Sequence, residues 1–155
     1  MAAYASLHAG VEIARRQWRE QLMDGQPLAD IRAARGYLMS TLGPLRREAF
    51  GVVFLDSKHR VLAYETLFFG TVDCATVHPR EVVRRTLELN AAAVILAHNH
   101  PSGDTTPSDA DRRLTGRLSA ALRLIDVRVL DHFVVARNAS VSFAEQGLIP
   151  DPTPP

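Results

Sequence analysis

The stretch AAAVILAHNHPSGDTTPSDAD, residues 91–111, carries the strongest structural signal in this chain. Its first seven residues, 91–97, are all apolar and predict a central strand that is covered on both faces. The polar loop at 98–106 follows, and Thr106-Pro107 predicts an N-cap and the first position of a helix that runs from 107 to about 124. A buried strand, a polar loop and a helix therefore follow one another directly.

The end of this predicted strand carries two histidines. In an extended backbone His98 and His100 project to the same side, because side chains alternate with a period of two residues, so both imidazoles can reach one ion. Asn99 points away from them. The pair is therefore a candidate for two ligands of one metal ion.

The predicted helix start supplies further polar groups. Ser108 and Asp111 are three residues apart and share a helix face, which brings Asp111 back over the loop. Two imidazoles and one carboxylate occupy three corners of a tetrahedral catalytic zinc site, whose fourth position holds a water. Such a site needs a base that does not bind the metal, and Glu48, at the head of the strand predicted at 48–56, is the candidate.

The rest of the chain alternates helical and strand patterns, which indicates an α/β (mixed α+β) class. Gly43-Pro44 precedes the clearest change of character, near residue 45. We divide the chain into an N-terminal helical segment (1–44), one α/β domain (45–144) and a flexible C-terminal tail (145–155). The predicted helices are 4–22, 28–42 and 79–90, and the further strands are 60–70, 127–136 and a short one at 140–143.

Composition excludes several classes of protein. The chain has 155 residues with 18 basic and 17 acidic side chains, a net charge of +1, which excludes a tail-driven DNA binder. Cys74 is the single cysteine, so an internal disulfide and a cysteine-built zinc site are excluded. The charged N-terminus does not fit a signal peptide, and no stretch approaches 18 apolar residues, so we expect a cytoplasmic protein without a membrane partner.

The spacing H-x-H, seven residues, S-x-x-D is met by His98, His100, Ser108 and Asp111, and it resembles the motif of the JAB/MPN metalloproteases. The resemblance is closer to the RadC proteins of bacteria, a branch of that family, over roughly residues 7–136. It is carried by REAFGVVFLD (47–56), VHPRE (77–81), ILAHNHPSGD (95–104) and VLDHFVV (129–135).

This resemblance implies a JAB/MPN fold, a cytidine-deaminase-like mixed sheet flanked by helices, and a zinc-dependent hydrolase of the JAMM type that cleaves a peptide or isopeptide bond. It implies that His98, His100 and Asp111 hold Zn²⁺, that Glu48 is the general acid/base, and that Ser108 donates a hydrogen bond to the developing oxyanion. Longer RadC proteins carry an N-terminal helix-hairpin-helix region, and we expect this chain to begin after it.

Two other functions are kept open. One is a DNA-associated repair or processing protein, which near-zero net charge disfavours. The other is a non-catalytic MPN interaction module, which the complete ligand set disfavours. Asp131-His132 has no nucleophile to form a triad with, so it is interpreted as packing or as support for the metal ligands. The apolar stripe of residues 7–22 fits either a homodimer contact or a cover for the sheet, and the protein or peptide substrate stays open.

Overall fold

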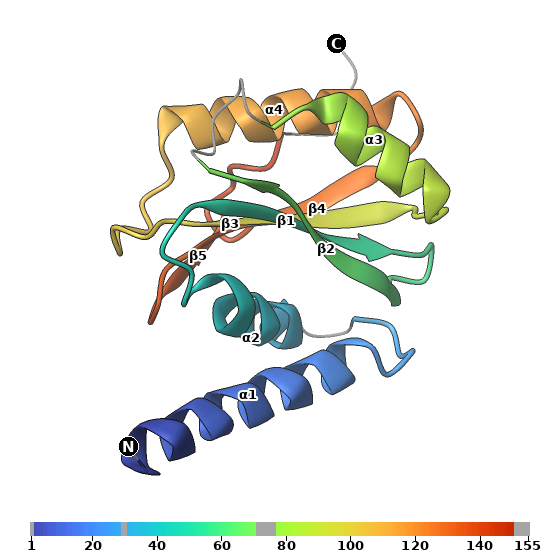
Figure 1. The fold of residues 1–155 in the computed structure, drawn as a ribbon. Helices are drawn as coiled ribbons and strands as arrows, with labels where there is room; N and C mark the ends of the chain where they lie inside the picture. Colours follow the sequence, from blue (N-terminus) through green and yellow to red (C-terminus); the bar gives the residue numbers. More distant parts are fainter. Residues whose placement is uncertain (1, 29–30, 71–76, 151–155) are drawn as a thin grey trace.

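A computed structural model describes residues 2–28, 31–70 and 77–150, with side chains from His8 onward. Cys74 lies outside the described residues. The chain forms four helices and five strands within these ranges (Figure 1). They are α1 (Ala2–Leu22), α2 (Ile31–Leu42), β1 (Ala49–Leu55), β2 (Val61–Phe69), α3 (Pro79–Glu88), β3 (Ala93–Asn99), α4 (Asp109–Arg123), β4 (Arg128–Val135) and β5 (Ser140–Ser142).

The strands form one mixed sheet in the order β2-β1-β3-β4-β5. β1 runs antiparallel to both β2 and β3, β3 and β4 are parallel, and β5 returns antiparallel to β4. Every residue of β1 and β3 is buried, as the uninterrupted apolar run predicts for a central strand. The predicted mixed α/β class is confirmed.

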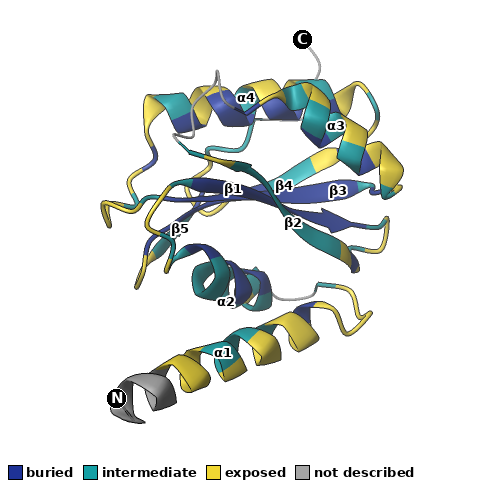
Figure 2. Ribbon diagram, viewed as in Figure 1, coloured by how far each residue is buried: buried dark blue, intermediate teal, exposed yellow. Residues whose placement is uncertain are grey.

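Helices cover both faces of the sheet (Figures 1 and 2). α3 and α4 lie on one face, where Leu114, Leu118 and Leu122 of α4 pack against one set of strand residues. α2 lies on the opposite face, where Leu38 and Leu42 pack against the alternate set. Because side chains alternate along each strand, β3 contributes even-numbered residues to the α4 side and odd-numbered residues to the α2 side.

The helix α1 lies against the outer side of α2 rather than on the sheet (Figure 1). A Cβ atom added to Gly36 would lie 2.7 Å from the Trp18 ring, so this small residue allows the two helices to approach closely. Leu22 is buried in the core, whereas Val11 and Ile13 are 47% and 58% exposed. Within the described ranges, no helix combines the length and the apolar character needed to cross a membrane.

Element boundaries differ from the sequence prediction by up to three residues, and two of these differences have a clear physical cause. The predicted helix at 107–124 begins at Asp109, and its N-cap is Ser108 rather than Thr106, because Asp111 completes a reciprocal capping box with Ser108. The predicted strand at 91–97 spans 93–99 instead. The preceding helix ends with Asn90 in a left-handed conformation (φ 52°) and with a hydrogen bond from Ala91 N to Thr86 O, which uses the first residues of the apolar run in a Schellman-type turn.

The segments at the two ends of the chain contact the sheet region. α2 shares a core cluster with strands β1, β3 and β4. Near the other end, Leu148 N donates to Phe143 O over 2.8 Å, and Ile149 and Pro150 line a hollow beside α4. The division at residues 45 and 145 stays a prediction, and residues 151–155 of the predicted tail lie outside the described residues.

Candidate metal centre

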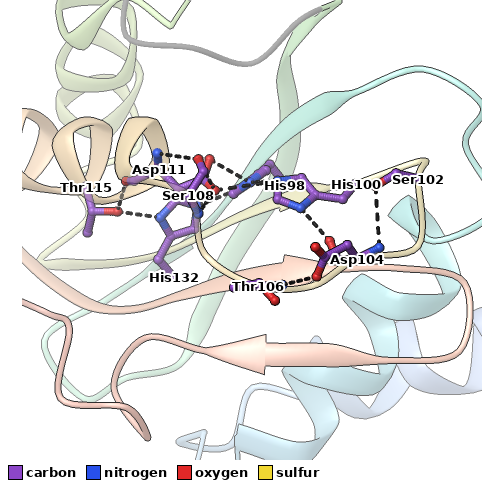
Figure 3. Close-up of polar contacts among 9 residues, drawn as sticks. All are labelled: His98, His100, Ser102, Asp104, Thr106, Ser108, Asp111, Thr115 and His132. Carbon is purple, nitrogen blue, oxygen red and sulfur yellow. Dashed lines mark hydrogen bonds and ion pairs between the residues drawn. The ribbon is translucent and has the colours of Figure 1, made fainter.

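The centre begins at the carboxyl end of β3, where His98 and His100 share one side of the strand (Figure 3). Their Nε2 atoms lie 3.0 Å apart. His98 is fully buried, whereas the side chain of His100 is 18% exposed. Asn99 faces the other side, as the alternation predicts, so the two imidazoles meet without an intervening side chain.

Asp111 reaches the two histidines from the first turn of α4. Its Oδ1 lies 3.0 Å from Nε2 of His98, and its Oδ2 lies 3.5 Å from Nε2 of His100. The orientation of this carboxylate comes from the capping box, because Oδ2 accepts from the backbone N of Ser108 (2.8 Å) and from its hydroxyl (2.7 Å). The three candidate ligand atoms all lie within 4.8 Å of one another.

The loop after β3 fixes the tautomer of His100. Nδ1 of His100 lies 2.7 Å from the carbonyl oxygen of Asp104, which can only accept a hydrogen bond. Nδ1 therefore carries the proton of the neutral ring, and Nε2 presents a lone pair toward Asp111 and His98 (Figure 3).

A buried relay fixes the tautomer of His98. The Thr115 hydroxyl donates to the backbone carbonyl of Asp111 (2.7 Å), so its oxygen accepts from Nδ1 of His132 (2.7 Å). Burial holds the pKa of His132 well below its usual value, which keeps this ring neutral and leaves its Nε2 as an acceptor. Nδ1 of His98, 2.8 Å away, must then donate to it, and Nε2 of His98 also presents a lone pair to the centre.

Nε2 of His98, Nε2 of His100 and the Asp111 carboxylate therefore lie close together, and the hydrogen bonds described above leave all three without a proton. Such an arrangement needs a cation, either a proton or a metal ion. Without a metal, hydrogen bonding to Asp111 raises the pKa of His100, with the charge of Glu48 adding to the effect, and the two histidines hold the pKa of Asp111 far below its usual value despite burial. This donor set fits a divalent ion that accepts imidazole and carboxylate ligands.

Glu48 lies beside this centre at the start of β1. The antiparallel pairing of β1 with β3 places Phe50 opposite His98, so the same register continued by two residues places Glu48 opposite His100. Its backbone carbonyl accepts from Gly70 N over 2.9 Å, and its side chain is partly exposed. The structure thus places Glu48 beside His100, close enough for its charge to act on that imidazole, and its role as a base stays a prediction.

Ser108 lies at the exposed rim, next to Asp111. Its hydroxyl caps α4 by accepting from Asp111 N (3.1 Å) and at the same time donates to the Asp111 carboxylate. The structure therefore assigns Ser108 a capping and ligand-orienting role, and its role as an oxyanion donor stays a prediction.

Asn99 and Thr115 contribute in ways that the motif spacing does not reveal. Asn99 accepts from Ala49 N (2.7 Å) and donates to the carbonyls of Leu45 and Arg47, which clamps the segment that carries Glu48 to the end of β3. Thr115 lies four residues after Asp111 in α4 and connects it to His132. A polar residue one helical turn after a ligand is the only sequence signal for this link.

Asp131 does not belong to the ligand set. Its carboxylate accepts from the Ser142 hydroxyl (2.6 Å) and from the backbone N of His132 and of Ala144. Burial raises its pKa. Asp131 therefore ties β4 to the β5 region, and of this Asp-His pair only His132 contacts a candidate metal ligand.

A profile of the RadC-like JAB domain matches residues 28–148. The chain belongs to the RadC family. This finding confirms the resemblance noted in the sequence and, with the mixed sheet described above, the expected JAB/MPN fold. The RadC-like match includes α2 and every residue of the candidate centre.

Curated RadC-like relatives of similar sequence are called UPF0758 proteins. The chain is 52% identical to the relative from Aeromonas hydrophila subsp. hydrophila over 146 residues, which cover 94% of this chain and 65% of the relative. It is 54% identical to the relative from Halorhodospira halophila over 148 residues, which cover 96% and 66% of the two chains. The chain thus spans just under two thirds of the length of these relatives, whose names state no activity.

Proposed function

We propose that this RadC-family chain is a zinc-dependent hydrolase that cleaves a peptide or isopeptide bond. One observation carries the proposal: the bare Nε2 atoms of His98 and His100 and the carboxylate of Asp111 converge from a strand end and a helix start. Two histidines and one carboxylate are the ligand set of catalytic zinc sites that keep one position open. His98 and Asp111 are buried while His100 is partly exposed, which gives the centre one side open to substrate.

The residues around the centre supply the remaining chemistry. His98, His100 and Asp111 would hold the zinc ion, which would supply polarisation of the scissile carbonyl and would lower the pKa of the attacking water toward about 7. Glu48 takes the proton of the attacking water and passes it to the leaving amine. Ser108, exposed beside Asp111, would donate to the oxygen on which negative charge develops once its hydroxyl proton turns away from the Asp111 carboxylate that it contacts in the resting site. His132 holds His98 in the tautomer that directs Nε2 to the ion.

The proposed substrate is a protein or peptide in the cytoplasm. The proposed location is supported by the use of a single cysteine. A DNA substrate is less well supported, because the net charge is +1. A non-catalytic interaction module is less well supported because such a module has no need of three convergent donors and a nearby carboxylate.

The test combines metal content with hydrolysis. Purified protein is analysed by elemental mass spectrometry and screened against a quenched-fluorescence peptide library, beside the variants Asp111→Asn and Glu48→Gln. We expect about one zinc per chain, lost in Asp111→Asn, and cleavage that falls by about 10²–10⁴-fold in Glu48→Gln while its zinc is retained. Wild-type protein that takes up no metal would contradict the proposed function, as would full activity in Glu48→Gln.

A further inference from the structure

A hollow of about 360 Å³ adjoins the candidate metal centre and shares His100 with it. Three loops form it at the same end of the sheet (Figure 1). They are the segment after α2, the loop after β3 and the turn after β4, and the lining residues are Gly43, Pro44, Leu45, Arg46, His100, Pro101, Gly103 and Arg137. The hollow is thus continuous with the partly exposed edge of one candidate ligand.

The charged residues of this hollow are both basic. Arg46 and Arg137 are exposed, and neither forms a hydrogen bond or ion pair with the residues that the structure describes. Some other arginines of the chain are engaged: Arg84 and Arg85 bind Glu81, Glu65 and Glu88. Because the described lining contains two arginines and no acidic residue, it favours an anionic ligand.

The backbone that carries the two arginines is held firmly. Asn99 binds the carbonyls of Leu45 and Arg47 on either side of Arg46. Gly43 lies so close to the turn after β4 that an added Cβ would be 2.9 Å from the Ala136 carbonyl oxygen and 3.4 Å from the Arg137 Cα. A hydrogen bond from Ala136 N to Ala139 O (2.8 Å) closes that turn. The backbone positions of both arginines therefore follow from the fold.

The local charge also favours an anionic ligand once a divalent ion is bound. The carboxylates of Asp111 and Glu48 would then balance the ion in formal charge, and Arg46 and Arg137 outnumber Asp104, the further acidic residue beside His100, by two to one. A polyanion is disfavoured, since the chain as a whole has a net charge of only +1. The observations thus favour a single carboxylate beside the reacting bond.

We propose that this hollow binds the carboxylate of an acidic residue in the substrate, next to the bond that the metal centre hydrolyses. The inference rests on the proposed function and adds a substrate class to it, namely acidic peptides. Arg46 and Arg137 are the residues that determine this preference.

The test uses small hydroxamates, which bind zinc whether or not the protein turns over a peptide. Zinc-loaded protein is titrated by calorimetry with the monohydroxamates of succinate, glutarate and adipate, and with neutral alkyl hydroxamates of equal length. We expect at least one acid to bind about threefold to tenfold more tightly than its neutral counterpart, with the gain shrinking as salt is raised. The double variant Arg46→Gln/Arg137→Gln should abolish that gain and keep the affinity for the neutral compound.

Matched controls separate the possible failures. The variant Arg19→Gln/Arg80→Gln removes two charges from α1 and α3, and it should keep the gain. Equal binding of acid and neutral compounds at every length would overturn the inference and leave the proposed function standing. Binding of neither compound by zinc-loaded protein would overturn the proposed function together with it. A phosphonate analogue that binds more than tenfold more tightly than the carboxylate would assign the hollow to phosphate and overturn the acidic-peptide class.

Discussion

Nδ1 of His98 lies 2.8 Å from Nε2 of His132, and both rings are completely buried. The two residues come from the neighbouring parallel strands β3 and β4, where His132 is the cross-strand partner of Leu96. A hydrogen bond between two neutral imidazoles requires one donor and one acceptor nitrogen. This contact therefore decides which nitrogen of His98 is available to an ion.

Replacement of His132 tests this contact through metal affinity. We expect His132→Leu to weaken zinc binding by about 10–100-fold, since His98 loses the acceptor that orients it. His132→Gln restores an acceptor and should recover part of the loss. Competition with a chromogenic chelator gives the affinities, and urea unfolding of the metal-free variants shows whether each is folded. Equal affinities in folded Leu and Gln variants would contradict the orienting role.

Replacement of Asn99 tests whether this residue stabilises the start of β1 without acting on the metal ligands. Its amide makes three contacts with Leu45, Arg47 and Ala49, on the face away from the metal centre. We expect Asn99→Ala to lower the free energy of unfolding by about 2–4 kcal/mol, because buried backbone groups lose their partners. Asn138→Ala, at an exposed position, should change it by less than about 0.5 kcal/mol. Zinc content near that of the wild type is expected in both, measured on protein that urea titration shows to be folded.

Ser108 has a capping role that is measurable without any substrate. We expect Ser108→Ala to lower the free energy of unfolding of the metal-free protein by about 1 kcal/mol, and Ser108→Gly by only a few tenths of that. The physical reason is that Asp111 N loses its hydroxyl acceptor. Urea unfolding at pH 7 gives both values. Unchanged stability in Ser108→Ala would show that the cap contributes nothing in solution.

Gly43 marks the closest approach of α2 to the turn after β4. A Cβ there would lie 2.5 Å from the Met39 carbonyl oxygen and 2.9 Å from that of Ala136, both of them backbone atoms. We therefore expect Gly43→Ala to destabilise the protein by about 1–3 kcal/mol. Gly116, inside α4 with nothing within 4 Å of an added Cβ, is the matched control. Gly116→Ala should stabilise the protein by about 0.5–1 kcal/mol, so thermal unfolding should shift in opposite directions in the two variants.

The buried phenol of Tyr64 is expected to make the protein less stable at alkaline pH. Burial raises the pKa of this phenol to about 12, above its usual value of 10. The unfolded chain releases the proton more readily, so the stabilising effect is complete below about pH 10 and is lost as the pH rises toward 12. Compared with Tyr64→Phe, the wild type should lose about 1–2 kcal/mol between pH 9.5 and pH 12. Urea unfolding of both proteins over this range checks it, and parallel pH profiles would contradict it.

Much of the fold is predictable from local pattern. The apolar run before His98 predicts a central strand, which is present, and the strands predicted at 48–56 and 60–70 are present as the antiparallel pair β1 and β2. The predicted start of α4 is two residues too early because two capping signals compete there. Thr106-Pro107 satisfies the local preference, but only the Ser108 box also brings Asp111 to the histidines.

The candidate metal centre is likewise only partly predictable from the sequence. Spacing alone brought His98, His100 and Asp111 together, since a strand end and a helix start lie on either side of one short loop. The contact between Thr115 and His132 depends on the register of β4 beside β3. The approach of Arg46 and Arg137 depends on the packing of α2 at Gly43. Both are long-range relations that no local periodicity encodes.

The alternation of β3 has a consequence for how this family can diverge. Insertion or deletion of one residue between Ala93 and Ala97 would exchange the two faces of the strand. His98 would turn toward α2, the Asn99 amide would turn toward α4, and any apolar residues between the change and His98 would exchange layers with them. We therefore expect homologues that keep the three candidate ligands to vary in the sequence of this strand but not in its length.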